Sequence, residues 1–157
     1  ALPNPVRMGD EIWFYYAGTN VDRTRRPAED RIDPYAPGGE RLGGISRAIM
    51  RLDGFVSVDA PYEGGELVTP LIRFEGNALE LNLDTAGGGS VLVEILDEDG
   101  KPIPGYTLDD ATPLIGNMVR FPVRWGEQRD VGALAGRAVQ LRFVMRDCKL
   151  YAFQFVP

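Results

Sequence analysis

The sequence contains no histidine and a single cysteine among its 157 residues. Histidine is the commonest general base and a frequent metal ligand, so its absence excludes Ser-His-Asp triads and the usual zinc sites within this chain. One cysteine cannot form an internal disulfide. With no histidine to activate its thiol, we interpret Cys148 as a buried strand residue rather than a nucleophile.

Long apolar runs and basic stripes are also missing. No stretch approaches the roughly 18 apolar residues that a membrane-spanning helix needs. The net charge is −6, from 23 acidic and 17 basic residues, and a phosphate backbone is bound through clustered basic side chains that displace its counterions. We therefore expect no membrane partner and no nucleic-acid partner.

Helix signals are almost absent, and the one candidate helical turn lies between Asp130 and Arg137. Elsewhere apolar and polar residues alternate with the period of two that is typical of strands, and 19 glycines and 12 prolines punctuate these segments. The predicted strands cover residues 11–16, 44–51, 55–59, 66–75, 78–84, 90–97, 118–125, 138–146 and 150–156.

Two kinds of turn signal join these strands. Asp99-Gly100 is a dipeptide favoured in tight hairpins, and the glycine-rich stretch TAGGGS at residues 85–90 predicts a hairpin loop. Several strands with one apolar face each are buried economically by packing two sheets face to face. We therefore predict an all-β fold: residues 51–157 form an antiparallel, jelly-roll-like β-sandwich, and residues 1–50 form an N-terminal β-hairpin extension.

The N-terminal extension is dense in aromatic residues. Trp13 and Tyr15 alternate with Phe14 and Tyr16, so both faces of this strand are apolar, which favours an interdomain or intersubunit surface. A long polar loop, from Thr19 to Gly43, follows before the next predicted strand. Loops of such length are usually functional or inserted.

The junction between the two parts carries a family resemblance. The motifs YYAG, GGISRAIMRLDGFVSVDA, VEILDEDGKPIPGY, VRFPVRW and LYAFQF are similar to the last propeller blade and C-terminal β-sandwich of invertase-like five-bladed β-propeller glycoside hydrolases and their uncharacterised bacterial relatives. The matching junction residues are Tyr15, Tyr16, Gly18, Gly44, Arg51, Asp53, Gly54, Phe55, Asp59 and Ala60.

This resemblance implies an accessory role. The catalytic carboxylates of such propellers lie in earlier blades, so we expect no catalytic residue here and a partner that is either a missing N-terminal catalytic propeller or another protein chain. Arg51 and Asp53 would belong to the interdomain hinge, with Gly54 supplying unusual backbone angles. An extracytoplasmic or secreted location is also implied. A stand-alone carbohydrate-binding module and a structural or oligomerisation domain are the alternatives.

Candidate ligand sites come from loop residues. Sugar rings stack on exposed aromatics, which favours Tyr62 and Tyr106 because both occupy loop segments. A structural calcium ion is a further hypothesis, with oxygen ligands from Asp59, Glu63 and Asp147 if their loops converge. The acidic residues at positions 97–99 and 109–110 are interpreted as turn caps rather than as a glycosidase pair.

Overall fold

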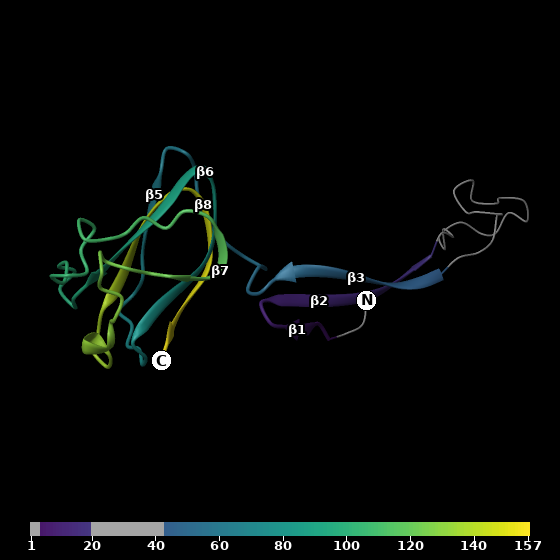
Figure 1. Cartoon of the computed structure of the whole chain (residues 1–157), viewed down its shortest axis with the longest axis horizontal. Coiled ribbons are helices and arrows are strands. Elements are labelled where there is room, and N and C mark those ends of the chain that lie inside the picture. Colours follow the sequence, from purple (N-terminus) through teal and green to yellow (C-terminus); the bar gives the residue numbers. More distant parts are fainter. Residues whose placement is uncertain (1–3, 20–42) are drawn as a thin grey trace, which may run out of the picture. The chain divides into compact units, whose positions relative to one another are not determined.

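The computed structural model describes residues 4–19 and 43–157. The chain divides into two compact units between Leu52 and Asp53, just after the predicted boundary at residue 50. Each unit has its own sheet and is described by itself (Figure 1). The predicted loop between Thr19 and Gly43 lies outside the described residues.

The first unit is a three-stranded antiparallel sheet in the order β1-β2-β3. Its strands are β1 (Val6–Met8), β2 (Glu11–Thr19) and β3 (Gly43–Arg51). β2 and β3 confirm the two predicted strands, whereas β1 was not predicted. Gly9 has φ 63° at the first position of the two-residue turn between β1 and β2, where a type II′ turn favours glycine.

The second unit is built on a five-stranded antiparallel sheet. Its strands are β4 (Val58–Ala60), β5 (Gly65–Val68), β6 (Ala78–Leu96), β7 (Asn117–Pro122) and β8 (Gln140–Val156). They lie in the order β4-β8-β6-β7, and β5 also pairs with β8. The predicted all-β antiparallel fold is confirmed. The predicted helical turn is a short 3₁₀ turn, η2 (Gly132–Leu134).

β6 is one strand where the sequence predicted two strands joined by a hairpin loop. The glycine-rich stretch forms a bulge in the ladder with β8: Thr85 pairs with Cys148 on one side of it, and Ser90 pairs with Arg146 on the other. A Cβ on Gly89 would lie 2.8 Å from the carbonyl oxygen of Arg146. Glycine is therefore needed for close approach of two backbones rather than for a chain reversal.

β8 likewise replaces two predicted strands, and it is sharply bent. Asp147 has φ 44° near its middle. The rings of Phe143 and Phe153 lie 5.8 Å apart between centroids, although a straight strand would separate these residues by about 33 Å. The two halves of β8 therefore face each other, which gives the five-stranded sheet the two-layered character of a β-sandwich.

The core lies between these halves. In β8 the buried residues are Leu141, Phe143 and Met145 before Asp147, and Cys148 and Leu150 after it. The change from odd to even numbers shows that the extra residue at the bend keeps the apolar side chains on the inner face. The other core residues on the two long strands are Leu79, Leu81, Leu83, Val91, Val93 and Ile95.

Two aromatic residues lie in this core or at its margin. Trp125 is buried, and its indole N–H donates a 2.8 Å hydrogen bond to the carbonyl oxygen of Val93. Phe153 faces inward but is 36% exposed at the margin of the core. Pro122 ends the edge strand β7, as expected for a residue without an amide donor.

Candidate functional site

One surface of the second unit brings together several of the residues predicted to bind ligands. We call the region formed by Asp59, Tyr62, Arg146 and Lys149 the Tyr62 surface. Asp59 pairs with Lys149 where β4 meets β8, and the adjacent loop carries Tyr62 toward Arg146 at the bend of β8. The bulge and the bend thus place an aromatic ring, a guanidinium and an ion pair along one edge of the sheet.

Tyr62 is 60% exposed, and its ring is held by Arg146. The guanidinium carbon lies 4.1 Å from the ring centroid, and Nε donates a 3.0 Å hydrogen bond to the carbonyl oxygen of Tyr62. This cation–π contact and the hydrogen bond orient the Tyr62 ring relative to Arg146. An exposed, oriented ring beside a hydrogen-bond donor is the chemistry that stacks on and orients a sugar.

The predicted calcium ligands do not gather. The Asp59 carboxylate accepts a 2.5 Å hydrogen bond from the Ser57 hydroxyl and forms a 3.4 Å ion pair with Lys149. The Ser57 hydrogen bond lowers the pKa of Asp59, with Lys149 adding to the effect. Across residues 4–19 and 43–157 no group of three acidic or thiol side chains could hold a metal ion. Asp59, Glu63 and Asp147 are therefore not brought together as one such group.

Tyr106, the second predicted sugar-binding residue, is a core residue. It is 8% exposed and packs edge-on against Trp125 at 5.1 Å between centroids. Its hydroxyl donates a 2.8 Å hydrogen bond to the carbonyl oxygen of Asp130. The expectation that its ring stands free in a loop is wrong, because the segment after β6 folds back along the edge of that strand, where Ile95 donates to the carbonyl oxygen of Tyr106.

The predicted interface residues Trp13, Tyr15 and Tyr16 lie on the central strand of the first unit. Trp13 and Tyr15 project from one face, and Tyr16 from the other, because side chains alternate along a strand. The Trp13 indole N–H donates to the Glu11 carboxylate at 2.6 Å, and the guanidinium carbon of Arg47 lies 3.8 Å from the Trp13 ring centroid. These two contacts tie the indole to residues of its own sheet.

Both faces of this three-stranded sheet carry apolar side chains. The Trp13 face carries Val6, Met8, Trp13, Tyr15, Ile45 and Ile49 beside the charged Glu11, Arg47 and Arg51, and the Phe14 face carries Ile12, Phe14, Tyr16, Ala48 and Met50 beside Arg7 and Ser46. Ile45 is 79% exposed and Ile49 is 50% exposed. Apolar side chains on both faces of so small a sheet are typical of an element that another layer covers.

The two predicted hinge residues take different roles at the junction. Arg51 ends β3 and is half-buried. Asp53 is exposed and has φ 56°, a left-handed conformation that aspartate tolerates better than most residues. Gly54 was expected to supply this unusual conformation, and the structure assigns it to Asp53 instead.

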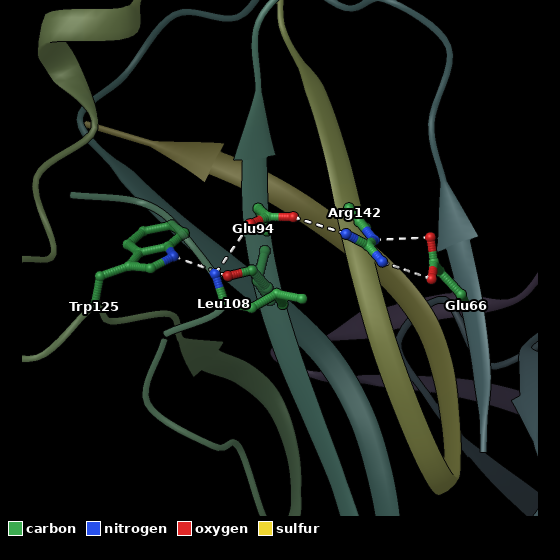
Figure 2. Close-up of polar contacts among 6 residues, drawn as sticks. Glu66, Glu94, Leu108, Trp125 and Arg142 are labelled. Atoms are coloured by element: carbon green, nitrogen blue, oxygen red, sulfur yellow. Dashed lines mark hydrogen bonds and ion pairs between the residues drawn. The ribbon is translucent and has the colours of Figure 1, made fainter. Parts of the chain in front are cut away.

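A polar network that sequence reasoning missed links three strands of the second unit (Figure 2). Arg142 on β8 makes two hydrogen bonds to the Glu66 carboxylate on β5, from Nε at 2.7 Å and from Nη2 at 2.9 Å. Its Nη1 donates to Glu94 on β6 at 3.1 Å, and the other Glu94 oxygen accepts from the backbone N–H of Leu108. Opposite charges at positions 66, 94 and 142 signal this network only once the strand register is known.

The acidic side chains of Glu66, Asp97 and Asp110 make structural contacts. The hydrogen bond from Arg142 lowers the pKa of Glu66, whereas a glycosidase acid needs a raised pKa. Asp97 accepts hydrogen bonds from the backbone N–H groups of Asp99 and Lys101 at 3.0 and 2.9 Å, and Asp110 accepts one from the Thr107 hydroxyl at 2.8 Å. These contacts agree with the interpretation of both acidic segments as turn caps.

Comparison with known proteins returned no match: no protein family, no curated protein and no solved structure resembles the chain at a significant level. In the described part of the chain, no helix has the length and apolar character required to span a membrane.

Proposed function

We propose that the chain is a non-catalytic accessory β-sandwich module of a glycoside-hydrolase-like protein, and that its three-stranded sheet docks against a β-rich catalytic partner. The sequence resemblance to invertase-like proteins suggests a five-bladed propeller as that partner. The accessory module would brace the propeller and could present the Tyr62 surface to carbohydrate.

One observation carries this proposal: both faces of the three-stranded sheet carry exposed apolar side chains. Burying an apolar side chain such as isoleucine contributes about 1.5–3 kcal/mol. Ile45 and Ile49, both at least half exposed, leave that stabilisation unrealised in the described chain. A β-rich partner that covers the Trp13 face would recover it.

The first test is enzymatic. The purified chain should show no hydrolysis of fructans or of arabinose- and xylose-containing glycans. Robust turnover that is abolished by changing one carboxylate of this chain would contradict the accessory role.

The second test concerns the partner. The reading frame upstream of Ala1 is expected to encode a β-propeller, which would then be produced joined to this chain. Trp13→Ser should lower the thermal midpoint of the propeller transition in the joined protein, because it removes apolar contact at the docking sheet. Tyr62→Ser is the matched control in the second unit and should leave the midpoint of the propeller transition unchanged. Equal effects of the two substitutions would count against docking through the sheet.

A second candidate function is carbohydrate binding, and the exposed Tyr62 ring held by Arg146 favours it. Glycan-array binding by the isolated chain should be lost in Tyr62→Ala and kept in Tyr106→Phe, which retains the buried ring. An array without hits, or loss of binding in neither variant, would remove this candidate.

A further inference from the structure

We propose that the open edge of β3 binds an extended, acidic strand of the partner, which adds a fourth strand to the three-stranded sheet. This inference rests on the proposed docking role of that sheet and adds the mode of contact and the chemistry of the partner. Strand addition of this kind is held by main-chain hydrogen bonds, while side chains on alternate positions select the sequence.

The register shows which backbone groups of β3 are available. The Leu52 N–H donates to the carbonyl oxygen of Asp10 at 2.8 Å, one step beyond the facing pair Glu11 and Arg51. In an antiparallel ladder hydrogen-bonded pairs alternate with non-hydrogen-bonded pairs. The even-numbered residues of β3 therefore bond to β2. The N–H and C=O groups of Ile45, Arg47 and Ile49 point away from it, where no described strand lies.

This edge has few of the features that normally prevent strand addition. Edge strands are protected by charged side chains, especially lysine, and by proline, bulges or short length; of these, β3 carries only the charges of Arg47 and Arg51. β3 has nine residues, contains neither proline nor lysine, and pairs with β2 in an unbroken register. The opposite edge of the same sheet is the three-residue β1, and the edge strand β7 of the second unit ends at Pro122.

The charges of β3 define its partner. Its only ionisable residues are Arg47 and Arg51, four positions apart, and both project from the Trp13 face with Ile45 and Ile49. Pairing with a second copy would bring arginines near arginines, and like charges across a ladder are destabilising. A strand with carboxylates opposite Arg47 and Arg51, and apolar residues opposite Ile45 and Ile49, would complement the edge.

The test uses the full 157-residue chain and a synthetic probe. The probe is a nine-residue peptide, matching the length of β3, with glutamate at its first and fifth positions, valine at its third and seventh, and threonine elsewhere. Aligned antiparallel from Arg51 to Gly43, its glutamates face the two arginines. We expect saturable binding in titration calorimetry. A peptide with lysine in place of both glutamates should bind at least about tenfold more weakly.

The hydrogen-bond mode is tested with two further probes. N-methylation of both valines removes two donors that face β3 and should weaken binding about tenfold or more. The threonines at the fourth and sixth positions of the peptide have N–H groups that point away from β3. N-methylation of these two threonines alters only the outer edge of the peptide and should leave affinity unchanged. Absence of binding by the glutamate peptide, or equal affinity of the two methylated peptides, would overturn the proposal.

Protein variants give an independent readout. Ile49→Pro removes an outward N–H without breaking a bond to β2 and should abolish peptide binding, whereas Ile49→Val keeps the amide and should bind normally. If the joined propeller responds to Trp13→Ser but no peptide binds, docking stands and strand addition fails. Self-association of the chain that Ile49→Pro abolishes would identify a second copy as the occupant and overturn the acidic partner.

Discussion

Glu94 on β6 and Arg142 on β8 face each other in the ladder, and Arg142 Nη1 donates a 3.1 Å hydrogen bond to the Glu94 carboxylate. The Glu94 side chain is only 4% exposed, whereas Arg142 also binds Glu66 at the surface. Arg142 on β8 therefore links Glu66 on the edge strand β5 to Glu94 on β6. The buried Glu94 carboxylate in turn holds the loop at Leu108. Hydrogen bonding by Glu66 also raises the pKa of Arg142.

Glu94→Gln should destabilise the fold by about 1–3 kcal/mol, because an amide cannot satisfy both the Arg142 guanidinium and the Leu108 N–H as acceptors without burying an unpaired NH₂ group. Glu80→Gln is the matched control on the same strand, where the exposed carboxylate accepts one hydrogen bond from Gln154. Urea unfolding at neutral pH measures both. Equal free energies of unfolding for the two variants would contradict the role assigned to Glu94.

Glu66 makes stability depend on pH. Its folded-state pKa is lowered by the hydrogen bond from Arg142, so its contribution is present above the unfolded-state pKa near about 4.3 and is lost as the pH falls through the folded-state value. Glu66→Gln should therefore show a smaller loss of unfolding free energy between neutral pH and about pH 3. The same acid sensitivity in wild type and variant would show that the pair is not coupled to folding.

Gly89→Ala should destabilise the second unit by about 1–3 kcal/mol or more, since the added Cβ would meet the backbone of Arg146 and Asp147. Gly87→Ala, two residues away in the same bulge, is the control because no atom lies within 4 Å of its Cβ position. Thermal unfolding distinguishes them. If the two midpoints agree, the close approach of β6 and β8 at the bulge is not required.

Cys148 should be a slow thiol in the folded protein. Burial raises its pKa, which lowers the thiolate fraction, and the side chain is enclosed by the core. A thiol-reactive disulfide reagent should label it slowly in buffer and rapidly in unfolding concentrations of urea. Rapid labelling without urea would show that the region between β4 and the bend of β8 opens readily.

The alternation of apolar residues predicted most strands and the all-β class, because the period of two is a local property. It could not predict that residues 78–96 form one strand. TAGGGS has the composition of a hairpin loop, and only the facing backbone at Arg146 and Asp147 shows why glycine is needed there. Likewise Asp53 rather than Gly54 takes the left-handed conformation, although glycine has the greater intrinsic freedom.

The residues of the candidate site were likewise predictable only where a local sequence pattern determines their exposure. The exposed ring of Tyr62 was predictable from its loop, and the apolar faces at Trp13 and Tyr16 from their alternation. Tyr106 occupies a similar loop, yet a hydrogen bond to Asp130, distant in sequence, places it in the core. The Glu66–Arg142–Glu94 network depends on strand register. The sequence does not reveal this register, because the three residues lie far apart along the chain.

β8 pairs with β4, β5 and β6, and it is the last of these strands in the chain. Because Val156 pairs with Ala78, the central ladder joins residues far apart in sequence, and topologies of this kind fold slowly. During synthesis on the ribosome, the apolar faces of β4, β5 and β6 would stay unpaired until residues 140–156 emerge. The nascent chain would therefore depend on chaperones to keep these strands from associating with other polypeptides.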